Sequence, residues 1–423
     1  RRQIKRMLIF CLTLLVLLPS CSDQNIPEDF SQEESAFRDE TSDTMKSPAP
    51  LNQQKIKLDP ERVLPGNPDN YEVGALVDDS IIYYIRDGSY FGLYFYDTKT
   101  GQTGKIGSID NYTTYSRPLR FVALNDKYYF QIGRGNTYED SESNVMQFTM
   151  EENSLTSCDS QYLSTKSVIL KKYMGQIAQR KTTFENGKEI SYIELYDIET
   201  NQKSRFLSKD VKSEGGFMTI PNFAVSGEEL YLFVQKYTPI YDENNTIVYL
   251  EWTSWTIEKY NSDGELVGSF PCDDAKEYFL ANIITQFRVW GDYIYFACGE
   301  EAAIYKMEDG TARLVLKSTT LPTFYPSGNS QEEEIASVLF YAYSQQFYLF
   351  DFEKGEIKIL DCPMNDSEKI YSCFRSGENI CYETWDGDDI FRCYLTTMDD
   401  LMALETKSLD LSHSLLDLDN LEQ

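Results

Sequence analysis

The sequence predicts an all-β fold, a β-propeller of seven four-stranded blades, and three observations support this. Tyr, Phe, Ile, Val and Thr recur in short runs instead of amphipathic stretches, and aromatic residues make up 14% of the chain. Polar turns recur at regular intervals along the sequence. Some runs, such as Ile81–Ile85, are apolar throughout, which is typical of a strand that is buried on both faces.

Each repeat contains an apolar strand, a second strand rich in aromatics, a third that ends in a polar residue, and a fourth. The clearest copies are 81–106, 190–207, 293–316 and 347–360. The turn after the third strand falls near Asp97, Glu151, Asp197, Asn261, Glu308, Glu353 and Thr397. Successive differences between these residue numbers are 54, 46, 64, 47, 45 and 44. Four strands in each 40 to 50 residues, roughly, are the signature of a propeller.

Three units need separate comment. The 64-residue interval is explained by a long hairpin over Tyr237–Trp255, with Asn244-Asn245 at its turn. The sixth unit is the poorest match, and its innermost strand is expected near Leu321–Tyr325, so six or eight blades stay open. Ring closure is expected to use Gln54–Leu58 as a strand paired with the last blade. A pair of β-sandwiches is the alternative architecture, but it gives no reason for the regular spacing.

Two of the turns carry a resemblance. The segments Tyr96–Gly101 (YDTKTG) and Tyr196–Thr200 (YDIET) resemble the repeats of bacterial lipoprotein propellers. TolB-type and quinoprotein-like repeats are the nearest comparison. The resemblance covers about Ile56–Leu411 and implies the fold, not an activity, because propellers include both enzymes and binding proteins.

The N-terminal segment predicts export. A basic lead precedes the apolar run Leu8–Leu18, which is too short to span a bilayer, and the run ends in Leu18-Pro19-Ser20-Cys21. A cysteine at this cut resembles the lipobox of bacterial lipoproteins, which implies a lipid on Cys21 and attachment to a bacterial membrane outside the cytoplasm. The alternative is an ordinary signal peptide with an incidental cysteine. The expected parts are a signal peptide (1–21), a disordered acidic tether (22–54), the propeller (55–411) and a C-terminal tail (412–423).

Cysteine and histidine usage limits the chemistry. No CxxC spacing occurs and the only histidine is His413, so we expect no zinc site, no histidine-dependent triad and no cofactor. If Gly377 and Gly387 centre two hairpins, Cys373, Cys381 and Cys393 lie side by side on one sheet face. A cross-strand disulfide is one outcome there, and buried free thiols are the favoured one.

Candidate ligand-binding residues come from the loops between second and third strands and between blades, which emerge on one face of a propeller. These loops carry aromatic and arginine side chains that suit a glycan or a peptide, although such rings also pack blade against blade. The candidates are Tyr90, Tyr115, Arg117, Arg134, Tyr241, Trp252, Tyr325 and Trp385. No catalytic residue and no metal ligand is predicted.

Charge and motifs narrow the function. The formal net charge is −29, spread along the chain, so nucleic acid is excluded as a partner and membrane attachment is expected to rest on the lipid. The sequence contains no GxSxG motif and no P-loop. It therefore favours a membrane-anchored extracytoplasmic binding or scaffolding module that acts through its loop face. The alternatives are a glycan-active enzyme with carboxylates in the central funnel, and a sensing or assembly partner of another envelope protein.

Overall fold

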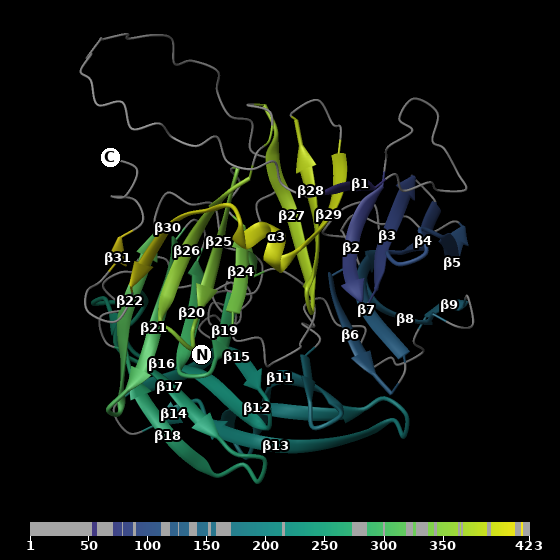
Figure 1. The fold of residues 1–423 in the computed structure, drawn as a ribbon. Helices are drawn as coiled ribbons and strands as arrows, with labels where there is room; N and C mark the ends of the chain where they lie inside the picture. The colour runs from purple at the N-terminus through teal and green to yellow at the C-terminus, as the bar shows by residue number, and fades with distance from the viewer. Residues whose placement is uncertain are drawn as a thin grey trace, which may run out of the picture. The chain divides into compact units, whose positions relative to one another are not determined.

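Seven antiparallel sheets follow one another along the chain, and each is one blade of a propeller (Figure 1). The structure is a computed structural model. It describes residues 53–56, 71–77, 79–87, 90–110, 119–125, 127–134, 142–150, 154–157, 171–213, 216–272, 286–298, 301–318, 325–326, 337–341, 345–362, 364, 367–386, 391–410 and 416–417. The prediction of an all-β propeller with seven blades is confirmed.

The first four blades run in chain order from the innermost strand outward. Blade 1 is β2 (Glu72–Val77), β3 (Ser80–Asp87), β4 (Tyr90–Asp97) and β5 (Thr103–Asp110). Blade 2 is β6 (Leu119–Leu124), β7 (Lys127–Arg134), β8 (Glu142–Thr149) and β9 (Ser154–Ser157). Blade 3 is β10 (Lys171–Tyr173), β11 (Gln176–Glu185), β12 (Lys188–Asp197) and β13 (Gln202–Asp210). Blade 4 is β14 (Lys212–Ser213), β15 (Gly216–Ser226), β16 (Glu229–Tyr241), β17 (Ile247–Tyr260) and β18 (Leu266–Pro271).

The last three blades depart further from the simple repeat. Blade 5 is β19 (Gln286–Trp290), β20 (Tyr293–Cys298), β21 (Glu301–Glu308) and β22 (Thr311–Ser318), with β31 (Leu416–Asp417) added parallel to β22. Blade 6 is β23 (Tyr325–Pro326), β24 (Ser337–Tyr341), β25 (Gln346–Asp351) and β26 (Glu356–Asp361), with β30 (Glu405–Asp410) outside β26. Blade 7 is β27 (Lys369–Ser376), β28 (Asn379–Trp385) and β29 (Phe391–Thr397), completed by β1 (Gln54–Ile56).

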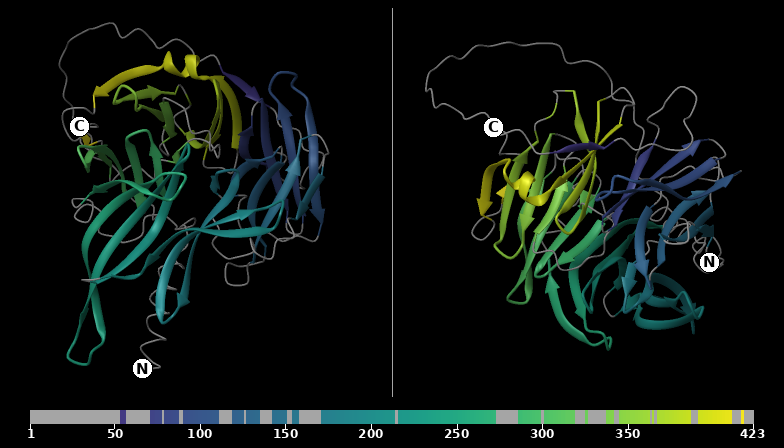
Figure 2. Two further views of the ribbon diagram at one scale, coloured as in Figure 1. Left: turned by 90° about the horizontal axis from the view of Figure 1, so that it is seen from below. Right: turned by 45° about the vertical axis from the view of Figure 1, so that its right-hand side comes forward.

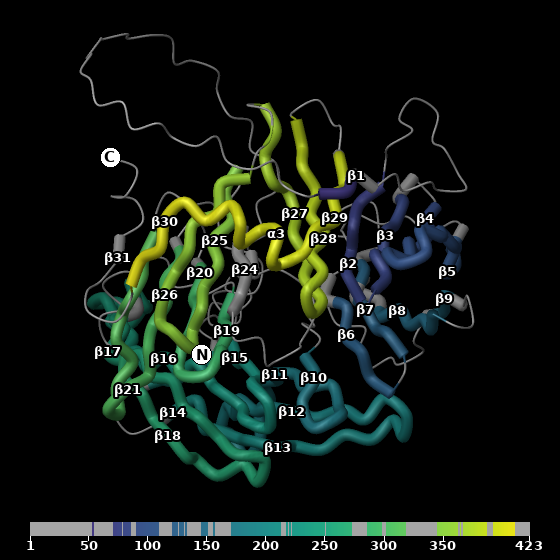
Figure 3. The backbone as a smooth tube through the Cα atoms, viewed as in Figure 1, coloured from purple at the N-terminus to yellow at the C-terminus, as the bar shows by residue number. Residues whose placement is uncertain are grey.

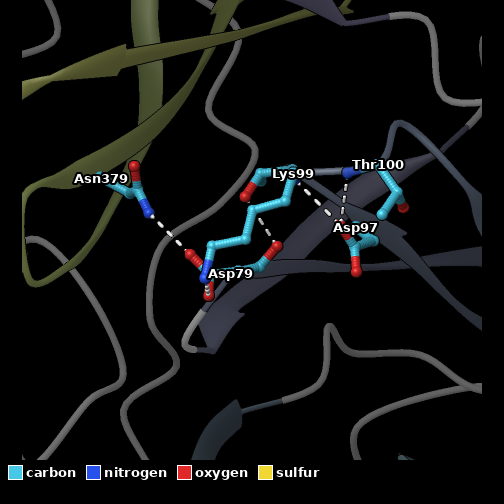
Figure 4. Close-up of polar contacts among 6 residues, drawn as sticks. Asp79, Asp97, Lys99, Thr100 and Asn379 are labelled. Atoms are coloured by element: carbon cyan, nitrogen blue, oxygen red, sulfur yellow. Dashed lines mark hydrogen bonds and ion pairs between the residues drawn. The ribbon is translucent and has the colours of Figure 1, made fainter.

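The ring closes through the N-terminal strand, as the sequence predicts. Gln54 pairs with Leu395, and Figure 3 shows β1 beside β29 although they lie at opposite ends of the described chain. Side chains also join blade 7 to blade 1. The Asn379 amide donates to Asp79 at 3.3 Å, and Asp79 also pairs with Lys99 at 2.5 Å (Figure 4). These partly exposed contacts contribute little individually, so the closure depends mainly on strand pairing and on buried contacts between blades 7 and 1.

The chain then crosses back over two blades after β29. Thr397 caps the short helix α3 (Met398–Met402) by accepting a hydrogen bond from the Asp400 N–H at 3.2 Å. Beyond this helix, β30 pairs with β26 of blade 6 and β31 with β22 of blade 5. Residues 416–417, which the sequence places in a tail, therefore extend a blade.

The sixth blade agrees in part with its expected innermost strand near Leu321–Tyr325. The first strand of the sheet is β23, which starts at Tyr325, and residues 321–324 lie outside the described residues. The longer strand Ser337–Tyr341 pairs with both β23 and β25.

The cysteines of blade 7 give a second correction, because Cys373 does not share a face with the other two. Ser376 pairs with Asn379, so the turn has two residues and is not centred on Gly377. This one-residue difference moves Cys373 to the opposite face of the sheet. Cys373 packs toward blade 6, while Cys381 and Cys393 pack toward blade 1 with their Sγ atoms 3.4 Å apart. All three are free thiols, as are Cys272 and Cys362, and Cys158 lies outside the described residues.

Candidate functional site

Two long hairpins stand out in adjacent blades, β11–β12 in blade 3 and β16–β17 in blade 4. In blade 3, β11 and β12 join through Asn186 and Gly187, which have φ of 50° and 78°. An Asn-Gly pair suits this two-residue turn because both residues tolerate positive φ. In blade 4, Asp242 Oδ1 accepts hydrogen bonds from the N–H groups of Asn244 at 2.9 Å and Thr246 at 2.8 Å, which fixes the β16–β17 turn.

Backbone hydrogen bonds link the two hairpins. The Val211 N–H donates to the Glu189 carbonyl at 2.9 Å, and the Met218 N–H donates to the Val211 carbonyl at 2.7 Å. β15 then pairs with β16, which places Phe217 opposite Tyr237. In the left view of Figure 2 the two hairpins extend from the same side of the propeller. They therefore form neighbouring parts of one surface.

The ends of these hairpins expose apolar side chains. Phe184 is 72% exposed, Tyr241 48%, Val248 61% and Tyr249 57%. Three other large apolar side chains of the described residues are exposed, Met174 in the turn between β10 and β11, and Leu266 and Val267 at the start of β18. We call these four residues the two-hairpin surface. Such a concentration marks a contact site more often than chance exposure does.

The charges around the two-hairpin surface are mainly acidic. Asp242, Glu243 and Glu251 are exposed near the end of the β16–β17 hairpin. In blade 3, by contrast, acids and bases compensate each other, because Glu185 pairs with Arg205 at 2.5 Å and Lys188 with Asp210 at 2.7 Å. The uncompensated negative charge lies on blade 4.

An aromatic cluster supports the blade 4 hairpin at its base. The Tyr237 ring stacks on Phe217 with centroids 5.6 Å apart and meets Trp252 edge to face at 5.2 Å. The Trp252 Nε1 is buried and has no hydrogen-bond partner among the described residues. Burial, with smaller contributions from Glu189 and Tyr241, raises the pKa of Tyr237 to about 12.

This raised pKa predicts a loss of stability at high pH. Tyrosine in the unfolded chain titrates near its ordinary pKa of about 10. Between that value and about 12 the unfolded state ionises at this position while the folded state stays protonated, so the stability that Tyr237 confers falls with rising pH. The measurement is urea unfolding at pH 9 and pH 11. Tyr237→Phe should lose less of its free energy of unfolding over this interval than the unaltered chain, and an equal loss would contradict the assignment.

The ligand-binding residues that the sequence predicts differ in their position and burial. Tyr241 and Trp252 lie on the β16–β17 hairpin. Tyr90 is only 6% exposed and its hydroxyl lies 2.8 Å from that of Tyr94, inside blade 1. Trp385 is half-buried at the end of β28, next to Asp386, which pairs with Arg392 at 2.8 Å. A ligand role for each stays a prediction.

For the other predicted site residues the structure gives a position on a strand at most. Arg134 ends β7 and Tyr325 begins β23, whereas Tyr115, Arg117 and Cys21 lie outside the described residues. Sequence reasoning missed Phe184, Val248 and Tyr249. The Asn-Gly turn two residues after Phe184 was a usable signal, because it identifies a hairpin end.

The described residues include neither a cluster of metal ligands nor a helix that could cross a membrane. In the described part of the chain no group of three or more His, Cys, Asp or Glu side chains could hold a metal ion. Within the same residues no helix is long and apolar enough to cross a membrane.

Comparison with known proteins supports no single activity. No family model and no curated protein matches the chain. Among solved structures, the propeller domain of the Trilobed protease from Pyrococcus furiosus is 12% identical, with 79% of this chain and 92% of that chain covered and a TM-score of 0.41. BamB from Moraxella catarrhalis is 9% identical (78% and 84% covered, TM-score 0.34), and an oligogalacturonate lyase in complex with manganese is also 9% identical (82% and 96%, TM-score 0.41). At such identities the likeness concerns the fold alone.

Proposed function

We propose that this protein is a binding or scaffolding module that acts outside the cytoplasmic membrane, anchored by a lipid on Cys21. The two-hairpin surface contacts its partner. The partner is another protein of the cell envelope, because the surface is apolar and acidic and extends from the body of the propeller.

The exposure of Phe184, Tyr241, Val248 and Tyr249 on linked neighbouring hairpins carries the proposal. Fixed turns support both hairpins, so their backbone loses little conformational freedom on binding. No arrangement of described side chains favours an enzyme over a binding protein.

Site-specific photo-crosslinking tests this function. The full chain is produced in bacteria with Val248→benzoylphenylalanine, irradiated, and its adducts are identified by mass spectrometry. The matched control is Val267→benzoylphenylalanine, because Val267 is 53% exposed on β18 of the same blade but lies away from the hairpin end. We expect one discrete protein adduct from position 248 and none from position 267. Equal labelling at both positions, or none at 248, would refute the proposed surface.

Anchoring is tested separately. Cells that produce the full chain should incorporate labelled palmitate into it, and Cys21→Ser should abolish the labelling and release the protein from the membrane fraction. Continued labelling of the Cys21→Ser variant would exclude this anchor.

A further inference from the structure

The β16–β17 hairpin extends beyond its neighbouring strands. β16 and β17 pair from Leu230 and Tyr260 to Tyr241 and Ile247. β18, however, pairs only with Thr256–Tyr260, and the last bond on that side runs from the Cys272 N–H to the Trp255 carbonyl at 2.9 Å. Residues 247–254 of β17 thus have β16 on one side and no described strand on the other.

This free edge is long. Eight residues of an antiparallel strand extend about 27 Å. Alternate residues of a regular edge strand direct both their N–H and C=O groups outward. The register shifts at Val248 and Thr253 leave Tyr249–Trp252 as the regular stretch, which gives about two such positions. A peptide that adds as a further strand forms these main-chain hydrogen bonds. A two-stranded ribbon is only marginally stable, so a third strand also stabilises the hairpin itself.

Two register shifts interrupt this edge, at Val248 and Thr253, but its sequence carries few of the residues that usually prevent strand pairing. The sequence from 247 to 254 is IVYLEWTS, with no lysine, no proline and one charge, Glu251. Val248 and Tyr249 are 61% and 57% exposed, so an added strand would cover apolar surface. The residue types are those of a strand that pairs readily.

Charge identifies the partner chemistry. Asp242 and Glu243 lie in the turn of the hairpin and Glu251 lies on the edge strand, and they outnumber Lys236, the exposed base on β16 opposite Ser254. The whole chain has a net charge of −29. Two copies of this chain repel each other, which disfavours edge-to-edge dimers. A segment with alternating basic and apolar residues matches both the acids and the exposed apolar side chains.

We propose that the free edge of β17 at residues 247–254 binds an extended, basic peptide segment of a partner protein by strand addition. This inference rests on the proposed function and specifies its partner class and its mode of binding.

The test uses the full chain in an uncharged detergent and three short fluorescent peptides, followed by fluorescence anisotropy. The first peptide alternates lysine and valine, the second alternates glutamate and valine, and the third is the first with every second backbone nitrogen methylated. We expect the lysine–valine peptide to bind and the other two to bind about tenfold or more weakly. Hydrogen exchange of the amides at 247–254 should slow when the first peptide binds.

Protein variants complete the test. Val248→Lys should weaken binding of the lysine–valine peptide about tenfold or more, because it adds like charge and removes apolar contact, whereas Val267→Lys adds the same charge elsewhere on blade 4 and should not. Equal binding of the methylated peptide, or no change in exchange at 247–254, would overturn strand addition. Dimerisation of the chain that Val248→Lys abolishes would also overturn it, because the occupant would be a second copy.

The two proposals fail in different ways. Discrete crosslinks at position 248 together with insensitivity to methylation would refute strand addition and leave the binding function standing. Absence of those crosslinks would refute the proposed function itself, whatever the peptides do.

Discussion

Phe233→Ala is expected to lower the free energy of unfolding by about 3–5 kcal/mol, the largest effect of any single change considered. Phe233 is completely buried between blades 4 and 5. Its ring centroid lies 4.9 Å from that of Phe296, 5.4 Å from Trp255 and 5.9 Å from Phe287. Truncation removes these contacts and leaves a cavity between blades that cannot close without moving a whole sheet.

The measurement is urea unfolding followed by tryptophan fluorescence, since Trp255 contacts the altered site. Phe184→Ala is the matched control, because Phe184 is 72% exposed and its loss should change the free energy of unfolding by about 0.5 kcal/mol or less. If the two variants were equally stable, the packing between blades 4 and 5 would be wrongly described.

Glu383→Ala is expected to cost about 2–3 kcal/mol, because a buried carboxylate joins the two ends of the ring. Glu383 on β28 is 1% exposed. Its Oε1 accepts from the Val73 N–H of blade 1 at 3.0 Å, and its Oε2 accepts from the Ser372 hydroxyl at 2.5 Å. Alanine leaves the Val73 N–H buried without this acceptor, exactly where the first blade meets the last.

Two comparisons check this assignment by urea unfolding. Glu383→Gln keeps a carbonyl oxygen for the Val73 N–H and should lose less than half as much stability as Glu383→Ala. Glu353→Ala removes an exposed carboxylate from a turn and should be nearly neutral. A Glu383→Ala variant as stable as the Glu353→Ala variant would show that this carboxylate does not hold the ring closed.

The repeat could be predicted because blade formation is local. Each blade is made of strands that follow one another along the chain, so the turn spacing near Asp97 and Asp197 reports it directly. The long hairpin around Asn244-Asn245 was visible for the same reason. Closure through Gln54 was also predictable, because a ring leaves its last blade short of one strand.

Register was harder to predict, because it depends on single residues. A turn of two residues in place of one moved Cys373 to the other face of blade 7. The crossing of β30 and β31 back to blades 6 and 5 has no local signal either, since it depends on which outer edges are free after the ring has closed.

The two-hairpin surface was likewise predictable only in part. The sequence identified Tyr241 and Trp252 as members of a long hairpin, but aromatic residues of a propeller are also buried within and between blades, and Tyr90 is buried inside blade 1. Whether a side chain on this hairpin is exposed depends on where the neighbouring strand ends. Only the strand pairing in the structure shows that β18 ends opposite Thr256.

By itself the sequence determined the fold class, favoured seven blades over six or eight, and identified the closing strand and the net negative charge, because composition, period and charge are properties of contiguous segments. The tertiary structure decided which side chains are exposed and which strand edge has no partner strand among the described residues. These depend on contacts between blades far apart in the chain, such as Glu383 with Val73.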